Sequence, residues 1–285
     1  MTERVNKSKG LWVFFILAYA IMLLTWGTMA AFQIEGASAN PDAPAPSPGA
    51  LLLFAVGGFS PSIAGIIMTW RVEGRPGLKD LWSRATRFNL GWKWYLTVVL
   101  IPILAAGLSA VAYLFRGGAF VESPLLIQPL NLIGFTVLIF LGGPISEEFG
   151  WRGFALDRLL TRWNAMSASL ILGVLWALWH LPLFFIPGTF QQQYGDPVPG
   201  FIVFAPGVIG RSVVYTWLHL GTRRSLWAAI LYHAVSNYTI SFLATLMSIG
   251  LVEHLLIECV YILIAAIIVI SWQRDKPETR GLFSE

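Results

Sequence analysis

Residues 125–153 read LLIQPLNLIGFTVLIFLGGPISEEFGWRG. No charged side chain occurs at positions 125–140, whereas Glu147, Glu148 and Arg152 follow closely behind this apolar run. Because a transmembrane helix needs roughly 20 predominantly apolar residues, the stretch predicts a membrane span with ionisable groups near one end. Comparable apolar stretches recur along the chain, so the sequence predicts an all-α, polytopic membrane protein.

The composition of the whole chain supports this fold class. Of the 285 residues, 56% are hydrophobic and 12% are charged, and the mean hydropathy is +0.68. A soluble domain typically carries about twice that charged fraction. The single cysteine, Cys259, excludes an internal disulfide and a thiolate metal site. The net charge of +4 is interpreted as a mark of membrane topology, and no nucleic-acid partner is expected.

Eight transmembrane helices are expected, at residues 11–34, 50–70, 93–115, 127–149, 167–186, 201–220, 226–248 and 252–272. They form a single integral membrane domain over residues 1–285. With both termini in the cytoplasm, 17 of the 19 Lys and Arg residues fall in segments on that side, as the positive-inside rule requires. Arg211 is an exception within a span, where a structural partner such as Glu148 or a lipid phosphate is expected.

Three groups of polar residues are predicted at membrane depth: Glu147, Glu148 and Arg152; His180; and His233 with Asn237. An ionisable side chain at this depth costs roughly 2.5–3.5 kcal/mol to insert and is a functional hypothesis by default. Glu148 and Arg152 share a helix face and can pair, whereas Glu147 points about 100° away from Glu148. The other histidines, His219 and His254, lie near span ends and are expected at the membrane interface.

These residue types suit peptide hydrolysis. A carboxylate and an imidazole directed at one water molecule can take its proton as it attacks a carbonyl, and Glu147 with His180 are the candidates for this step. His233 and Asn237 can donate hydrogen bonds to the developing oxyanion. Such a site needs no nucleophilic Ser or Cys, and no cofactor is favoured.

Several alternatives stay open from the residues alone. Glu147, His180 and His233 could bind zinc with water in the fourth position, which ranks second. The Glu–Arg pair and the His–Asn pair could also serve only to hold helices together. At the level of function, the alternatives are a proton- or ion-coupled transporter and a non-catalytic membrane scaffold or immunity protein.

Three motifs give the chain a family likeness. EEFGWR (147–152) resembles the EExxxR motif of the CPBP family, the membrane CAAX proteases and bacteriocin-processing proteins, and WALWHLP (176–182) and HAVSN (233–237) resemble its second and third motifs. The likeness runs in order from about Gly142 to Asn237, and a catalytic core is expected at about 127–248. Trp176 departs from the family pattern, in which Phe is frequent.

The resemblance implies an all-helical intramembrane endopeptidase, related to the enzyme that trims prenylated CAAX proteins. It implies Glu147 as the catalytic glutamate, His180 as the residue that positions water, and His233 with Asn237 as the oxyanion residues. Glu148 and Arg152 match supporting positions. Members of the family have been described both as metalloproteases and as glutamate-dependent proteases. The expected setting is a prokaryotic cell membrane, with the bilayer and a membrane-associated protein or peptide substrate as partners.

Overall fold

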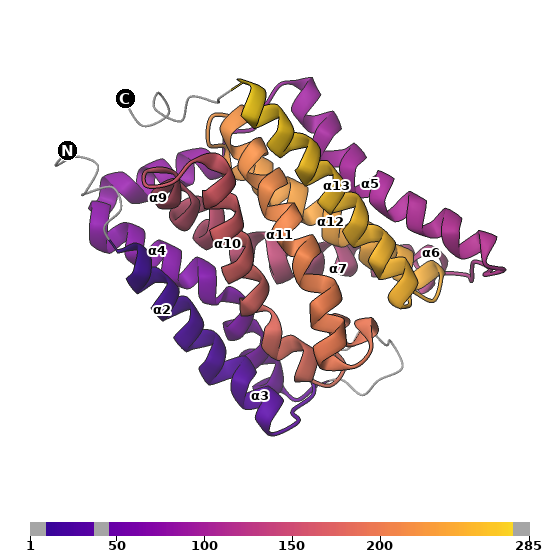
Figure 1. Cartoon of the computed structure of the whole chain (residues 1–285). Coiled ribbons are helices and arrows are strands. Elements are labelled where there is room, and N and C mark those ends of the chain that lie inside the picture. The colour runs from indigo at the N-terminus through magenta and orange to yellow at the C-terminus, as the bar shows by residue number, and fades with distance from the viewer. Residues whose placement is uncertain (1–9, 37–45, 276–285) are drawn as a thin grey trace.

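The computed structural model describes residues 10–36 and 46–275, and within these ranges the chain forms helices and no strand. Hydrocarbon offers the backbone no hydrogen-bonding partner, so a segment that crosses it has to satisfy its own N–H and C=O groups, as a helix does. The predicted all-α class is confirmed. Figure 1 shows the helices packed into one bundle, with the beginning of α2 (Leu11–Met22) and the end of α13 (Leu251–Asp275) toward the same upper-left side.

The bundle begins with α2, a π-helical turn (Leu23–Gly27), α3 (Thr28–Ala31), α4 (Pro48–Ala85) and α5 (Trp92–Phe115). The central part comprises α6 (Pro124–Ile127), α7 (Pro129–Phe140), a π-helical turn (Leu141–Ile145), α8 (Ser146–Gly150), another π-helical turn (Trp151–Ala155) and α9 (Leu156–Leu160). It is completed by α10 (Ala165–Trp179), two 3₁₀ segments (Leu181–Phe185 and Phe190–Tyr194), α11 (Pro197–Gly221), α12 (Leu226–Leu246) and α13.

Seven segments of the described residues are long and apolar enough to cross a membrane: Leu11–Ala31, Pro48–Ala85, Trp92–Phe115, Leu130–Leu160, Ala165–Phe185, Pro197–Gly221 and Leu251–Arg274. The polytopic organisation is therefore confirmed. The other predicted span corresponds to α12, which has 21 residues but a lower hydropathy, because it includes polar side chains such as His233 and Asn237. The cytoplasmic placement of both termini stays a prediction, and residues 1–9 and 276–285 lie outside the described part of the chain.

Two spans are longer than the sequence predicts. The span expected to end at residue 70 continues to Ala85, and the one expected to end at residue 149 continues to Leu160. The polar residues in these extensions pair with one another across the fold. Asp157 lies 3.0 Å from Arg84, and Arg158 lies 2.5 Å from Glu73. Because these charges find partners on other helices, helical structure resumes beyond the break at Gly74 and continues past the polar residues.

Helix α8 packs directly against the backbone of α4. A Cβ atom on Gly150 would lie 2.2 Å from the carbonyl oxygen of Pro61, and one on Gly65 would lie 2.7 Å from the Cα atom of Gly150. Only glycine allows such an approach, as is common where membrane helices pack closely. This contact fixes the position of the helix that carries Glu147 and Glu148.

We expect the substitution Gly150→Ala to destabilise the protein by about 1–3 kcal/mol, because the new methyl group has to displace backbone atoms of α4. Thermal unfolding of the purified protein in detergent measures the effect. Gly134→Ala on α7 is the matched control, since a Cβ atom there meets nothing within 4 Å. Equal unfolding temperatures for the two variants would contradict the close approach of α4 and α8.

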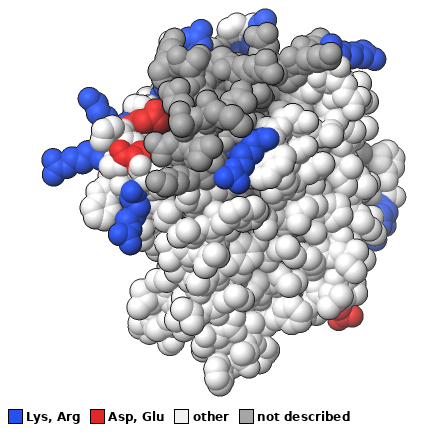
Figure 2. All heavy atoms as spheres, turned by 60° about the vertical axis from the view of Figure 1, so that its left-hand side comes forward, with Lys and Arg blue, Asp and Glu red and all other residues white. Residues whose placement is uncertain are grey.

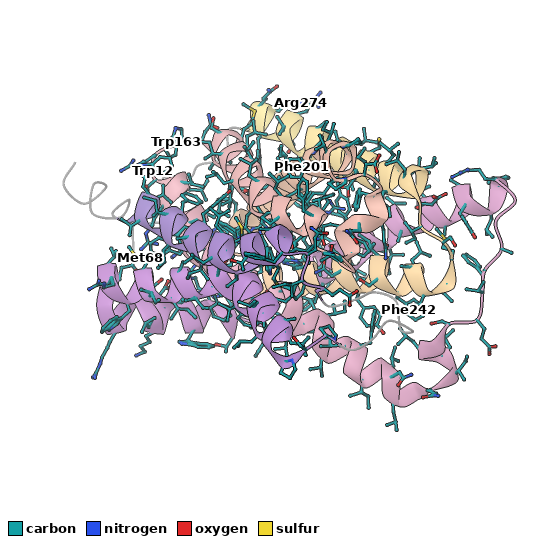
Figure 3. The ribbon with its side chains drawn as sticks, turned by 90° about the horizontal axis from the view of Figure 1, so that it is seen from below. Trp12, Met68, Trp163, Phe201, Phe242 and Arg274 are labelled. Atoms are coloured by element: carbon teal, nitrogen blue, oxygen red, sulfur yellow. The ribbon has the colours of Figure 1, made fainter. Side chains whose placement is uncertain are left out.

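The surface of the bundle is largely apolar. Side chains such as Ile16, Leu24 and Leu138 are 69%, 74% and 70% exposed, as lipid-facing residues are. In Figure 2, Lys and Arg gather around the upper end of the molecule, and most of the remaining face carries no charge. Figure 3 shows side chains filling the space between the helices, with Trp163 and Met68 toward one side and Phe242 toward the other.

Candidate active site

Glu147 lies in the first turn of α8 and points into the bundle, where its side chain is only 5% exposed. Its Oε2 atom accepts hydrogen bonds from the indole N–H groups of Trp176 on α10, at 2.6 Å, and of Trp151, at 3.3 Å. Among the described residues, no hydrogen bond to Oε1 accompanies these two. The carboxylate is therefore held by one oxygen and can present the other to a ligand.

Glu148 points in another direction, as the helical geometry predicts. Arg152 donates from Nη1 to both Glu148 oxygens, at 3.0 and 3.2 Å, and both side chains are completely buried. The guanidinium lies between aromatic rings, 3.6 Å from the centroid of Tyr215 and 4.2 Å from that of Trp176. The predicted Glu148–Arg152 pair is thus present and is enclosed by protein.

His233 on α12 completes this ion pair. Its Nδ1 atom lies 2.6 Å from Glu148 Oε1, and because an ionised carboxylate only accepts hydrogen bonds, Nδ1 carries the proton. Its Nε2 atom lies on the side of Gly143, where a Cβ atom would be 2.9 Å from it and 2.6 Å from Asn237 Nδ2. Two polar atoms of α12 therefore converge on a glycine that lies just before α8.

His180 follows α10 as its C-terminal cap. Its Nδ1 atom lies 2.8 Å from the carbonyl oxygen of Trp176, which can only accept, so the neutral imidazole has its proton on Nδ1 and a lone pair on Nε2. The ring packs edge-on against Trp179 and Phe204, with centroid distances of 4.8 and 5.2 Å. These contacts fix the orientation of a ring nitrogen that can accept a proton.

Trp176 connects the predicted site residues. Besides donating to Glu147, its ring lies 5.7 Å from the ring of His180 and 5.9 Å from that of His233. Glu147, His180 and His233, which come from three different helices, thus surround one indole. The sequence marked Trp176 only as a departure from the family pattern, and its role as a hydrogen-bond donor to Glu147 was missed.

Comparison with known proteins places a family match over the segment that carries these residues. Residues 129–239 match the family model described as type II CAAX prenyl endopeptidase Rce1-like. This segment is similar to the Rce1-like family. A curated relative, CAAX prenyl protease 2 of Methanococcus maripaludis, is 32% identical over 108 residues, which cover 38% of this chain and 40% of the relative. The resemblance that the three motifs indicated is confirmed over this segment, which includes every predicted catalytic residue.

The site residues are also the zinc set that the sequence suggested. In the described ranges, 10–36 and 46–275, no group of three or more His, Cys, Asp or Glu side chains is arranged to hold a metal ion. The zinc set suggested by the sequence, Glu147, His180 and His233, therefore does not fit the ion in this structure.

Arg211 has the structural partner that was expected, but this partner is Glu258 rather than the suggested Glu148. Arg211, on α11 of the Rce1-like segment, donates to Glu258 of α13 at 2.5 Å, and the hydroxyl group of Tyr194 donates to the same carboxylate at 2.7 Å. Glu148 is satisfied by Arg152 and His233 instead. The isolated acid at position 258 within an apolar span was the available signal, but sequence does not say which helix it faces.

His219 and His254 lie near helix ends, as expected, but both are buried rather than at the surface of the protein. His219 Nε2 lies 2.8 Å from Asp157 Oδ1. His254 is completely buried, and its ring is stacked on Tyr194 at a centroid distance of 3.7 Å. Both side chains are thus enclosed by protein, and their depth relative to the membrane interface stays a prediction.

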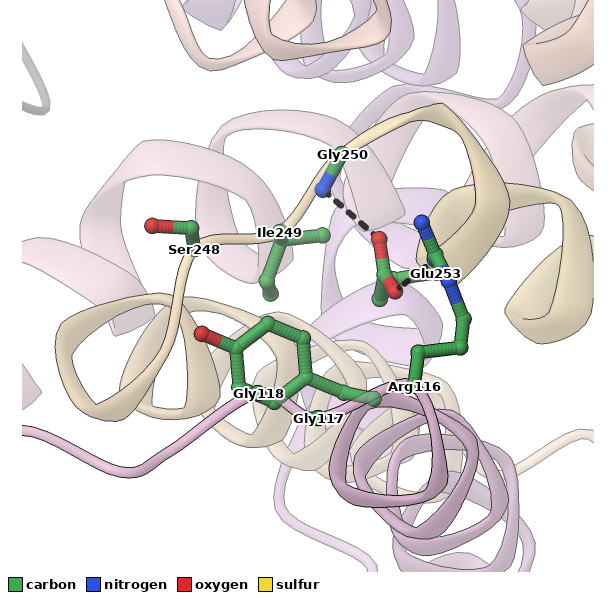
Figure 4. A pocket seen from close by; sticks show the side chains of 8 residues that line it. Arg116, Gly117, Gly118, Ser248, Ile249, Gly250 and Glu253 are labelled. Carbon is green, nitrogen blue, oxygen red and sulfur yellow. Dashed lines mark hydrogen bonds and ion pairs between the residues drawn. The ribbon is translucent and has the colours of Figure 1, made fainter.

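A pocket of about 430 Å³ opens where α5 ends and α13 begins, lined by Tyr113, Arg116, Gly117, Gly118, Ser248, Ile249, Gly250 and Glu253. Figure 4 shows Glu253 between the backbone N–H of Gly250 and the guanidinium of Arg116, at 3.0 and 2.6 Å. None of the predicted site residues lines this pocket. It lies outside the Rce1-like segment, and we assign it no part in the chemistry.

Proposed function

We propose that the chain is an intramembrane endopeptidase in which Glu147 activates the water molecule that hydrolyses a peptide bond. The observation that carries the proposal is the gathering of Glu147, His180 and His233 around Trp176. Buried ionisable groups from separate helices are costly in a membrane protein and mark functional sites. The family of residues 129–239 supports a protease over other functions.

The chemistry follows from the free positions on these side chains. Glu147 accepts a proton from water at Oε1 while the water oxygen bonds to the carbonyl carbon. His180 accepts a hydrogen bond from the same water at Nε2, which fixes its orientation. The proton then passes from Glu147 to the amide nitrogen as the C–N bond breaks, so that the products are a carboxylate and an amine. General acid–base steps of this kind contribute typically 10²–10⁴-fold to the rate.

His233 and Asn237 act on the carbonyl oxygen. Asn237 donates from Nδ2, and His233 donates from Nε2 in its charged form, with Glu148 as the counter-ion. Arg152 fixes Glu148 and so keeps His233 in place. Preorganised donors that face the position of a developing oxyanion stabilise it without reorganisation during the reaction. Because Nδ1 already donates to Glu148, His233 carries a second proton on Nε2 only when the imidazole is charged.

The substrate is proposed to be a membrane-associated protein or peptide, and the setting a prokaryotic cytoplasmic membrane. The name of the Methanococcus maripaludis relative makes a prenylated CAAX tail the first substrate to test. A bacteriocin precursor or peptide pheromone lacks the lipid but offers the same peptide bond. The purified protein should be incubated in nanodiscs with matched peptides, with and without a prenyl group, and the products identified by mass spectrometry.

The expected result is cleavage at one bond, with one ¹⁸O atom from labelled water in the new carboxyl group. Failure to cleave any member of a membrane-peptide library, in a sample whose thermal unfolding shows a folded protein, would contradict the proposal. Activity should also survive a metal chelator, because the site residues do not form a metal-binding group. Loss of activity on chelation that returns with zinc would favour the metalloprotease alternative instead.

We expect the substitution Trp176→Phe to lower kcat/KM by about 10–150-fold. Phenylalanine keeps the ring but removes the N–H group that lies 2.6 Å from Glu147 Oε2, and a hydrogen bond to a charged group contributes about 1.5–3 kcal/mol. Cleavage kinetics measure the effect. Trp217→Phe is the control, because this half-buried tryptophan on α11 packs on Trp94 away from Glu147. Equal activity of the two variants would show that the indole N–H of Trp176 does not contribute to catalysis.

The transporter and scaffold alternatives make different predictions. A proton-coupled transporter should show flux in proteoliposomes that depends on Glu147 or His180, without peptide cleavage. A scaffold should retain its biological effect in a Glu147→Ala/His180→Ala double variant. The buried Arg211–Glu258 pair adds polar groups outside the proposed site, but the two charges neutralise each other and need no transported ion.

A further inference from the structure

Helix α4 is much longer than a membrane crossing requires. Its 38 residues correspond to about 57 Å of helix, whereas the hydrocarbon core of a bilayer is about 30 Å thick. The backbone departs from helical geometry at Gly74, where φ is 65° and ψ is −152°. The chain thus has a break at the point where the apolar part of the helix ends, and a further segment follows before the turn to α5.

The segment around this break exposes cations and indole rings together. Arg71, Arg75 and Lys79 are exposed, and Trp70 and Trp82 are 58% and 56% exposed. We call these five residues the basic–aromatic surface. Arg75, Lys79 and Trp82 follow one another at helical spacing and share one face, while Leu81 and Arg84 on the opposite face are buried.

The acids of the same segment do not compensate these cations. Glu73 binds Arg158 at 2.5 Å. Asp80 lies 2.9 Å from Arg84 and 3.5 Å from Arg224. Across the part of the chain that the structure describes, no acidic side chain forms an ion pair with Arg71, Arg75 or Lys79. The segment therefore directs its acids to arginines of the fold and leaves its cations on the outside.

Exposed cations beside exposed tryptophan rings favour one kind of partner, the headgroup region of a membrane. Tryptophan favours the membrane–water boundary, where its ring lies in the headgroup region. Helices with Lys or Arg and exposed aromatic residues lie in that plane, and each cation near an anionic leaflet adds to the attraction. We propose that the basic–aromatic surface binds the headgroups of anionic phospholipids in the leaflet at this end of the bundle. The phosphate groups bind Arg71, Arg75 and Lys79, and the indoles of Trp70 and Trp82 enter the boundary beside them.

This surface is joined to the helix that carries the candidate site. The ring of Trp82 packs edge-on against Phe149, at a centroid distance of 5.2 Å. Arg84 donates to the carbonyl oxygen of Gly153 at 2.8 Å and to Asp157 at 3.0 Å. Lipid bound to the surface therefore stabilises the packing of α4 against α8 and the turn that follows it, which raises the resistance of the whole bundle to unfolding.

The test uses the full chain in nanodiscs of phosphatidylcholine, with or without phosphatidylglycerol. Retained phosphatidylglycerol is counted by native mass spectrometry, and thermal unfolding is followed in parallel. The test variant is Arg71→Gln/Arg75→Gln/Lys79→Gln. The matched control is Lys93→Gln/Arg223→Gln/Arg274→Gln, which removes the same charge from exposed positions on other elements. A third variant, Arg71→Lys/Arg75→Lys, keeps the charge.

We expect phosphatidylglycerol to raise the unfolding temperature of the parent protein, and the test variant to bind this lipid at least about tenfold more weakly. The control should bind within about twofold of the parent, as should the charge-keeping variant. Equal losses in the test and control variants would overturn the assignment to α4, because net charge alone would then explain binding. Stabilisation of the parent in phosphatidylcholine by free inorganic phosphate, to the same extent, would overturn the assignment to lipid.

Discussion

Glu147→Gln should lower kcat by about 10²–10⁴-fold, which is the usual contribution of a positioned general base. Glutamine keeps the shape of the side chain and an oxygen that accepts the indole hydrogen bonds of Trp176 and Trp151. It removes the negative charge and, with it, the ability to take a proton from water. The variant thus separates chemistry from folding, which an alanine substitution at a buried position would not do.

The measurement is the single-turnover rate of peptide cleavage in nanodiscs, together with the unfolding temperature of each sample. Glu122→Gln is the matched control, because Glu122 is exposed in the connection between α5 and α6 and the change removes the same carboxylate. The control should keep the parent rate. A loss smaller than about tenfold in Glu147→Gln, with unfolding unchanged, would show that another group activates the water.

The sequence predicts local relations within the site well. Residues four apart on a helix share a face, and this spacing gave the Glu148–Arg152 pair and separated Glu147 from it. The His233–Asn237 spacing likewise placed two polar atoms on one side of α12, where they converge at Gly143. These relations depend only on helix geometry, so a single sequence is enough to predict them.

The sequence did not predict which residues of different helices contact each other. Hydropathy shows that a segment crosses the membrane, but not which neighbour it contacts, so the Arg211–Glu258 pair and the bond between His233 and Glu148 were not predicted. The ends of α4 and of the span Leu130–Leu160 were missed for a related reason. Their charges look like loop residues until the distant partners are known.

Composition likewise does not predict which Lys and Arg residues are exposed on the surface of the folded protein. The six Lys and Arg residues between positions 71 and 93 support the predicted topology of the membrane protein, but they are not equivalent in the fold. Arg84 is buried against Asp157, whereas Arg71 and Arg75 are exposed. The difference depends on which face of α4 contacts α8 and α9, and it decides which cations can meet lipid.

Glu258→Gln should destabilise the protein by about 3–5 kcal/mol, the usual cost of breaking a buried ion pair from one side. The side chains of Arg211 and Glu258 are 10% and 2% exposed, and their atoms approach to 2.5 Å. Without the carboxylate, the guanidinium stays buried with no counter-charge. Glutamine keeps one oxygen that can accept from the Tyr194 hydroxyl, so the lost charge is the main change.

A double variant and a second ion pair make this prediction specific. Arg211→Met/Glu258→Met removes both charges and should recover most of the stability, because buried pairs replaced by apolar side chains are often neutral. The Arg116–Glu253 pair has a similar separation, 2.6 Å, but Arg116 is 55% exposed while Glu253 is 4% exposed. Glu253 also accepts from the backbone N–H of Gly250, so Arg116→Gln should cost less than Glu258→Gln. Thermal unfolding of all four proteins measures these differences. If Glu258→Gln cost no more than Arg116→Gln, the pair would not be desolvated, and Arg211 would have to face water or lipid headgroups instead of the interior of the bundle.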